Sequence, residues 1–222
     1  MKARQSRINY SDSRFLILGS IPGSTTSSFK NGVTNLAPEF IVEVATISHI
    51  FWAEQICEEM LSSAIARGTG ISKRSPQSIQ MKMKQGEAVI AFTADGKWAG
   101  FSYISAWANG EFVSNSGLIV APEFRKTGVA KKIKRRIFEL SRQKYPEAKI
   151  FSLTTGLAVM KMNHELGFQP VTYSELPADD AFWEGCKSCV NSHILMSKGR
   201  KNCLCTAMLY EKGEIKQEGA IC

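Results

Sequence analysis

The stretch FVSNSGLIVAPEFRKTGVAKKIKRRIFELSRQKY, from Phe112 to Tyr145, decides the fold of this chain. It predicts a strand, a tight turn and a strongly basic helix. The strand ends at Pro122, because proline has no N–H to donate to a neighbouring strand. The helix is indicated by apolar residues at helical spacing, namely Val129, Ile133, Ile137 and Leu140.

The turn before this helix, Arg125-Lys126-Thr127-Gly128-Val129-Ala130, has the composition of a phosphate site. It places free backbone N–H groups at a helix N-terminus, where the helix dipole is positive. Gly128 has no side chain, so a pyrophosphate can approach the backbone closely, and Ala130 is small for the same reason. The turn therefore predicts a binding site for a phosphorylated cofactor.

The pattern Arg/Gln-x-x-Gly-x-Gly/Ala after an apolar strand resembles the acyl-CoA-binding motif of the GNAT superfamily of N-acyltransferases. Arg125, Gly128 and Ala130 fill its three defining positions. The resemblance implies an acyl-CoA co-substrate whose pantetheine arm bonds to the strand backbone and whose phosphates bind the turn. The residues it implies for this role are Leu118, Ile119, Val120, Arg125, Lys126, Thr127, Gly128, Val129 and Ala130.

The composition limits the number of hydrophobic cores, the chance of a membrane span and the kind of binding partner. The chain has 222 residues with 44% hydrophobic content, enough for one sizeable core. No apolar run approaches the roughly 20 residues of a membrane helix. A net charge of +8 favours an anionic partner, which could be nucleic acid, a membrane surface or a phosphorylated cofactor such as CoA. With no convincing secretion signal, we expect a cytoplasmic protein.

The order of predicted elements gives a mixed α/β fold with three domain-level segments. Residues 1–37 are rich in Ser, Thr, Gly and Asn and are expected to be a flexible extension, residues 38–175 the acyltransferase domain, and residues 176–222 a Cys-rich appendage packed on it. Turns at Asp95-Gly96 and Asn109-Gly110 join three antiparallel strands, and the basic helix then makes a right-handed crossover to a parallel strand. The expected strands are 40–46, 88–94, 97–107, 112–121, 149–154 and 168–173, and the other expected helices are 48–67, 76–85 and 157–166.

This order resembles the GNAT fold over about residues 39–173. In that family the last meander strand and the following parallel strand splay apart. The pantetheine arm lies in the gap, where the thioester is presented to an amine.

Acyl transfer needs a base for the amine and an acid for the leaving sulfur. The family often supplies the acid as the Tyr of Tyr-x-x-x-Gly-Phe, but Asn163 occupies that position, so the role is not transferred. His164 is a neighbouring candidate, and a bound water or release as thiolate are alternatives. Candidates for the base are Glu111, Glu123, Asn115 and Ser116, although both glutamates could equally be exposed turn carboxylates.

Longer stretches carry a closer resemblance, and they include GISKRSP, NSGLIVAPEFR, TTGLAVMKMNHELGF and FWEGCKSCVNSHILMSKGRKNCLCTAMLY. They are similar to a bacterial branch of GNAT enzymes linked to arginine biosynthesis and related to N-acetylglutamate synthase. The resemblance implies L-glutamate as acceptor, with acetyl-CoA or succinyl-CoA as donor. Two substrate carboxylates need cationic side chains, and the candidates are Lys73, Arg74 and Lys161, each of which could instead be surface charge.

Four cysteines near the C-terminus form two close pairs, Cys186-x-x-Cys189 and Cys203-x-Cys205. Four thiolates can hold one structural zinc ion, although the second pair is tighter than the usual spacing. Reduced, partly buried thiols and a redox pair are the alternatives.

Three other functions remain open at this point. A GNAT enzyme could acylate another amine, such as a peptide, lysine or polyamine, or it could be an inactive CoA sensor. A nucleic-acid-binding module would use the basic helix and the cysteine-rich tail. We expect an enzyme with a small-molecule substrate and without a nucleic-acid or membrane partner, and a homodimer is left open.

Overall fold

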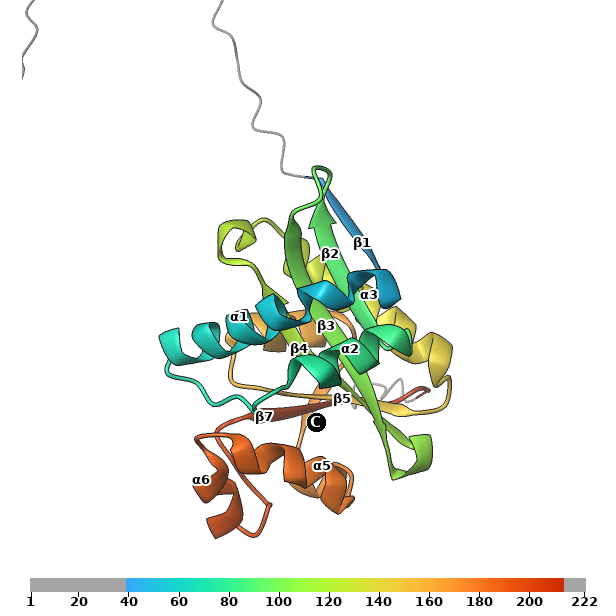
Figure 1. Cartoon of the computed structure of the whole chain (residues 1–222). Coiled ribbons are helices and arrows are strands. Elements are labelled where there is room, and N and C mark those ends of the chain that lie inside the picture. Colours follow the sequence, from blue (N-terminus) through green and yellow to red (C-terminus); the bar gives the residue numbers. More distant parts are fainter. Residues whose placement is uncertain (1–38, 214–222) are drawn as a thin grey trace, which may run out of the picture. The chain divides into compact units, whose positions relative to one another are not determined.

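A computed structural model of the chain describes residues 39–213 (Figure 1). Its centre is a seven-stranded sheet with the strand order β1-β2-β3-β4-β5-β7-β6. The strands are β1 (Phe40–Val44), β2 (Ala88–Thr93), β3 (Trp98–Trp107), β4 (Phe112–Val120), β5 (Lys149–Thr154), β6 (Gln169–Val171) and β7 (Thr206–Tyr210). The sheet combines antiparallel pairs with one parallel pair, which confirms the predicted mixed α/β class.

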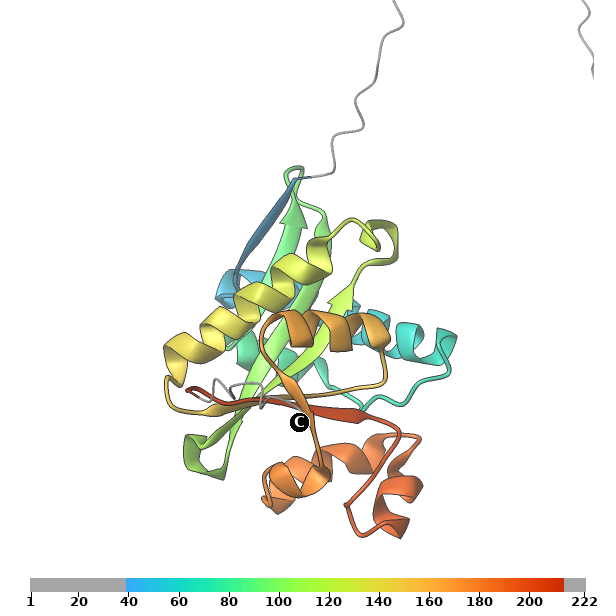
Figure 2. The same cartoon turned by 180° about the vertical axis from the view of Figure 1, so that it is seen from behind.

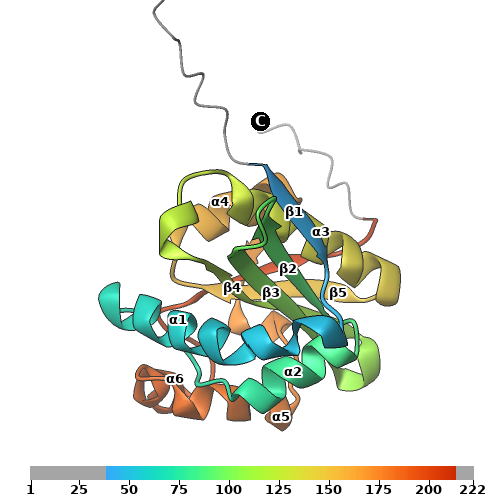
Figure 3. The ribbon, with the colours of Figure 1, turned by 45° about the horizontal axis from the view of Figure 1, so that its top comes forward.

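Helices cover both faces of the sheet (Figures 1 and 2). The α-helices are α1 (Ala53–Ala66), α2 (Pro76–Lys84), α3 (Val129–Lys144), α4 (Leu157–Glu165), α5 (Asp180–Glu184) and α6 (Ser192–Ser197). Short 3-10 helices are η1 (Ile47–Trp52), η2 (Ala108–Gly110), η3 (Pro122–Phe124), η4 (Tyr173–Glu175) and η5 (Gly185–Ser188). Helices α1 and α2 lie on one side, and α3 and α4 on the other, as Figure 3 shows from above.

Two apolar clusters hold these layers together. On one face, Ile56 and Met60 of α1 and Met83 of α2 pack against Phe101 of β3. On the other face, the helical stripe predicted for α3 is buried, and Ile133 and its neighbours pack against β2, β3 and β4. Burial of these aliphatic side chains is the main favourable contribution to folding.

The helix predicted over 48–67 begins differently from the expectation. Its first part is the 3-10 helix η1, and α1 starts only at Ala53. The turn predicted at Asn109-Gly110 is also longer, because Ala108, Asn109 and Gly110 all have positive φ and form η2. Neither difference changes the order of the strands.

The meander and the crossover place β4 beside β5 at the middle of the sheet. These two strands are parallel and pair only over Phe112↔Lys149, Val113↔Ile150 and Ser114↔Phe151. Beyond Ser114, none of the described strands pairs with the edge of β4 that faces β5. The two strands therefore splay apart, as the resemblance implied.

One strand was missed by the sequence analysis. Strand β7 pairs antiparallel with β5 on one side and with β6 on the other. The edge strand is β6, which contains Pro170, a residue that suits an edge because it has no N–H to donate. Strand β7 lies between β6 and β5. Part of the predicted C-terminal appendage therefore belongs to the central sheet.

The predicted flexible extension, residues 1–37, lies outside the described residues. None of the helices in residues 39–213 has the length and apolar character required to cross a membrane.

Candidate active site

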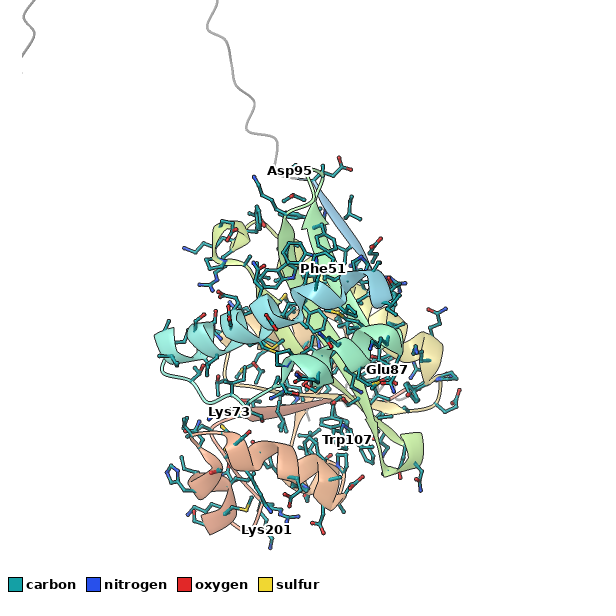
Figure 4. All side chains as sticks on the ribbon, in the orientation of Figure 1. Phe51, Lys73, Glu87, Asp95, Trp107 and Lys201 are labelled. Atoms are coloured by element: carbon teal, nitrogen blue, oxygen red, sulfur yellow. The ribbon has the colours of Figure 1, made fainter. Side chains whose placement is uncertain are left out.

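A pocket of about 1170 Å³ opens where β4 and β5 separate. At one end it is lined by Arg125 and Ala130 of the phosphate turn. It continues along β4 from Ser114 to Val120 and along β5 from Phe151 to Thr154. Its other end lies between the loop that precedes α2 and the C-terminal helices, where Figure 4 labels Lys73 and Trp107. The pocket is long enough to connect a phosphate site with a second substrate.

The phosphate turn has the geometry expected of an anion site. Lys126 and Gly128 have φ values of 66° and 90°, and this left-handed backbone leads directly into α3. The hydroxyl of Thr127 donates to the Phe124 carbonyl at 2.6 Å and fixes the turn. A Cβ on Gly128 would meet no atom within 4 Å, so the space beside the helix N-terminus is open. The first N–H groups of α3 are therefore available to an anion.

Arg125 is held by α1 rather than left free. Its Nη2 lies 2.6 Å from Glu59 Oε1 and 2.7 Å from Ser63 Oγ. The side chain therefore ties α1 to the phosphate turn, and Glu59 offsets its charge. The contribution of the turn to anion binding then rests mainly on backbone N–H groups.

A bulge shapes β4 inside the pocket. The pairing with β3 shifts between Phe101 and Tyr103, opposite Gly117. Gly117 has φ 64°, and a Cβ there would lie 2.5 Å from the Tyr103 ring. Only glycine fits this position without strain. The bulge changes the direction of β4 where the unpaired edge of the strand begins.

The end of the pocket beside α2 and the C-terminal helices, which we call the acceptor end, contains a cation–aromatic pair of the half-buried Arg74 and the buried Tyr103. Arg74 Nε donates to the Tyr103 hydroxyl, and Arg74 also donates to the Ser72 carbonyl. Its guanidinium carbon lies 5.8 Å from the centre of the Tyr103 ring. The guanidinium forms no ion pair within residues 39–213. An unpaired cation held in place by Tyr103 is suited to a substrate carboxylate.

Comparison with solved structures finds proteins that share the fold at low sequence identity. N-acetylglutamate synthase from Neisseria gonorrhoeae, complexed with coenzyme A and N-acetyl-glutamate, matches with a TM-score of 0.55 and 18% identity over 78% of this chain and 35% of that chain. The Mycobacterium tuberculosis protein Rv2747, in complex with CoA and NLQ, matches with a TM-score of 0.54 and 16% identity over 77% and 98% of the two chains. The acetyltransferase-like protein yncA of Salmonella typhimurium, with acetyl-CoA, matches with a TM-score of 0.53 and 14% identity over 82% and 99%.

The chain has the GNAT acyltransferase fold. This chain corresponds to about a third of the Neisseria synthase. No family model and no curated protein matches the sequence. The likeness to solved structures therefore establishes the GNAT fold, and the reaction has to be inferred from the pocket.

Only some of the predicted residues of the GNAT site line the pocket. Lys126, Thr127 and Gly128 of the turn before α3 are not among the lining residues. Those that line the pocket are Lys73, Arg74, Asn115, Ser116, Leu118, Ile119, Val120, Arg125 and Ala130. Val129 is buried in the core, so only its backbone can serve a cofactor. Glu111, Glu123, Lys161 and His164 are exposed and do not line the pocket.

Asn163, at the position of the usual GNAT tyrosine, is fully buried and does not line the pocket either. Its Nδ2 lies 3.5 Å from Met208 Sδ, so the side chain points into the core. The helix places Ala158, Val159 and Met162 toward the pocket instead. The α4 residues that line the pocket are therefore apolar.

The sequence analysis missed Tyr103, Tyr173 and Glu184, which also line the pocket. Tyr103 lies on a strand that is apolar almost throughout, so nothing local distinguished it. Glu184 is the only carboxylate among the described lining residues, and its Oε1 lies 2.6 Å from Lys187 Nζ.

All four C-terminal cysteines line the acceptor end of the pocket. Burial, followed by the neighbouring thiols Cys203, Cys189 and Cys186, raises the pKa of Cys205 to about 12. Burial and the neighbouring Cys189 and Cys203 also raise the pKa of Cys186. Cys186 and Cys205 therefore remain protonated at neutral pH.

The arrangement of the cysteines does not fit the predicted zinc site. Within residues 39–213, no group of three or more His, Cys, Asp or Glu side chains could hold a metal ion. Cys189 Sγ accepts from the Asn191 N–H at 3.5 Å, and Cys203 Sγ lies 4.0 Å from the Asn191 carbonyl oxygen. Cys189 and Cys203 thus contact the backbone of their own segment.

Proposed function

We propose that this protein is an acyl-CoA-dependent N-acyltransferase. The observation that carries the proposal is the single pocket that joins the phosphate turn, the unpaired edge of β4 and Arg74. CoA phosphates would bind N–H groups at the start of α3. The pantetheine arm would hydrogen-bond to the β4 backbone at Leu118, Ile119 and Val120. The thioester would then lie between the two strands, facing the acceptor end.

For the acceptor we propose L-glutamate, with acetyl-CoA or succinyl-CoA as donor, in the first part of arginine biosynthesis. The charge of the pocket supports an anionic acceptor. Its described lining contains five cationic side chains, Arg67, Lys73, Arg74, Lys82 and Arg125, against the one carboxylate of Glu184. Of these, Lys82 and Arg125 are paired with glutamates outside the lining, which leaves Arg74 the best-placed cation. A polyamine would be repelled by this charge.

In the proposed reaction the neutral amine attacks the thioester carbonyl carbon, and the protein orients both groups. The C–N bond forms, the C–S bond breaks, and the nitrogen gives up one proton to water. Backbone N–H groups of β4 would stabilise the developing oxyanion. Among the predicted residues that line the pocket, Asn115 and Ser116 are the uncharged polar ones. Because Asn163 is buried away from the pocket, we propose that the sulfur leaves as a thiolate or takes its proton from water.

A steady-state assay tests the proposal. Release of free CoA would be followed from acetyl-CoA and from succinyl-CoA, with L-glutamate as acceptor and with other amino acids, a peptide amine and spermidine in parallel. We expect turnover with glutamate and a clear preference for one donor.

Other outcomes would select another function. Turnover only with a different amine would keep the acyltransferase and reject glutamate. Tight CoA binding without turnover on any amine would indicate a CoA sensor. Salt-sensitive binding to DNA or RNA, with no CoA binding, would indicate a nucleic-acid-binding protein.

A further inference from the structure

Lys134 is a buried cation that the proposed reaction does not yet use. It lies in the middle of α3, and only 2% of its surface is exposed. It forms no ion pair with any residue in the range 39–213. A lysine is seldom buried without a carboxylate partner, because removing an ammonium from water costs on the order of several kcal/mol. The buried ammonium lowers the stability of the folded protein, and this cost indicates that the charge has a functional use.

A directional chain of hydrogen bonds connects Lys134 to the pocket wall. Lys134 Nζ donates to Asn115 Oδ1 at 3.2 Å, and Asn115 Nδ2 donates to Ser141 Oγ at 2.7 Å. Ser141 Oγ then donates to the Ile137 carbonyl at 2.9 Å. An ammonium can only donate, so it fixes which end of the Asn115 amide carries the oxygen. The charge of Lys134 therefore sets the orientation of Asn115.

Asn115 lies at the point where β4 and β5 separate. The last paired residues are Ser114 and Phe151, and Asn115 is the next residue on β4. Its side chain is 7% exposed, and the residue lines the pocket. The thioester of the proposed reaction lies in this gap, so Lys134 is one side chain away from the reacting group.

We propose that Lys134 is a positioning residue for acyl transfer, which holds Asn115 and places a positive charge beneath the thioester. This inference rests on the proposed function. Negative charge develops on the carbonyl oxygen and then on the sulfur during transfer, and a fixed cation in a dry site stabilises both. With no tyrosine at position 163, this charge would assist departure of the thiolate.

The surroundings of Lys134 make this charge sensitive to pH. Burial lowers the pKa of Lys134 to about 7, and no charged neighbour contributes to the shift. Around the ammonium, β4 contributes the neutral Asn115, α3 contributes Ser141 through Asn115, and the Phe168 ring lies 4.9 Å away before β6. The charge is therefore present at pH 6 and is lost as pH rises past neutrality.

The test compares the wild-type protein with Lys134→Met from pH 6 to pH 9. We expect kcat at pH 6 to fall tenfold or more, and the ratio of wild-type to variant kcat to approach one at pH 9. The Kd for CoA should stay within twofold, because the phosphate turn is at the other end of the pocket. The melting temperature should rise, because the variant no longer buries an unpaired ammonium. Lys84→Met, at an exposed position on α2 outside the pocket, is the matched control.

Two results would overturn the inference. A kcat ratio that stays within twofold at every pH would show that the charge does not act on transfer. A variant that loses stability and CoA affinity together would show a purely structural role. Ser141→Ala removes the acceptor of Asn115 Nδ2 and the donor to the Ile137 carbonyl but keeps Lys134, so it provides a second measurement and should lower kcat severalfold. Absence of turnover by the wild-type protein with any amine would reject the proposed function and this inference together, whereas wild-type turnover with an unaffected Lys134→Met variant would reject this inference alone.

Discussion

At the scale of single residues, the proposed choice of an anionic acceptor depends mainly on Arg74. Its guanidinium lines the pocket, donates to the Tyr103 hydroxyl and has no carboxylate partner within residues 39–213. We predict that Arg74→Met raises the KM for glutamate by about tenfold to a hundredfold, the loss expected for a charge-assisted hydrogen bond. The KM for acyl-CoA should change less than twofold, and steady-state kinetics with each substrate varied would measure both.

The matched control for Arg74 is Arg135→Met. Arg135 is exposed on α3 and does not line the pocket, so its loss should leave both KM values unchanged. If Arg74→Met instead lowered kcat with an unchanged KM for glutamate, Arg74 would act only in the transition state and would not select the acceptor.

The thiol of Cys205 gives a prediction about pH. Burial raises its pKa to about 12, so the folded protein holds this proton more tightly than the unfolded chain. The stability that this thiol contributes is therefore complete below the ordinary thiol pKa and is lost as pH rises from about 9 toward 12. We predict that the melting temperature falls more steeply above pH 9 in the wild-type protein than in Cys205→Ser. Parallel curves for the two proteins would contradict the raised pKa.

The same raised pKa bears on chemical reactivity. Iodoacetamide reacts with the thiolate, so at pH 8 it should alkylate Cys205 at least tenfold more slowly than it alkylates the same thiol in denaturant. Mass spectrometry of timed samples would measure both rates. Fast labelling of the folded protein would favour a redox role for the cysteine segment.

At the scale of structural elements, the role of the phosphate turn can be tested by comparing Gly128→Ala in the turn with Gly96→Ala in a β-hairpin. Gly128 and Gly96 have φ values of 90° and 82°, and a Cβ at either position would meet no atom within 4 Å. Gly128→Ala and Gly96→Ala should therefore each cost about 1 kcal/mol of stability through backbone strain. Only Gly128→Ala should weaken CoA binding, by about tenfold, because its methyl group enters the anion site.

Calorimetry with CoA and thermal melts would separate the two effects. Equal CoA affinities for Gly128→Ala and Gly96→Ala would remove the phosphate turn from the proposed site. A large loss of stability in Gly128→Ala alone would mean that the turn has a structural role that the open space beside Gly128 does not reveal.

Some structural elements could be predicted from the sequence, and the positions of several site residues could not. The turn before α3 and the apolar stripe of α3 follow from local patterns, namely a glycine at a helix start and a 3.6-residue period, whereas the splay of β4 from β5 was expected only from the resemblance to the GNAT family. The placement of Glu111, Glu123 and His164 outside the pocket could not be foreseen, because it depends on which face each residue presents after packing. Lys134 was hidden among nine basic residues between Arg125 and Lys144, and burial alone distinguishes it from its neighbours.

At the scale of the whole molecule, the described C-terminal segment is part of the sheet. Strand β7 is short, and its sequence TAMLY carries no turn signal that would mark a hairpin. Its partners β5 and β6 precede it by many residues, so no local pattern could reveal the pairing. Phe182, Trp183 and Leu195 of the intervening segment pack with Phe151 of β5 in the same apolar cluster. The acceptor end of the pocket and the central sheet are therefore built by one continuous core.

This continuity predicts how the molecule unfolds. Leu209, on β7, is 5% exposed, whereas Leu204, in the loop before it, is 61% exposed. Leu209→Ala should lower the free energy of unfolding by about 2 to 5 kcal/mol, and Leu204→Ala by less than about 0.5 kcal/mol. Far-UV circular dichroism and tryptophan fluorescence in urea should give coincident single transitions for both variants, because a change in β7 destabilises the sheet as a whole. Two separate transitions in Leu209→Ala, with the second at the wild-type midpoint, would instead mean that the segment from residue 176 onward unfolds independently and that the rest of the sheet is stable without β7.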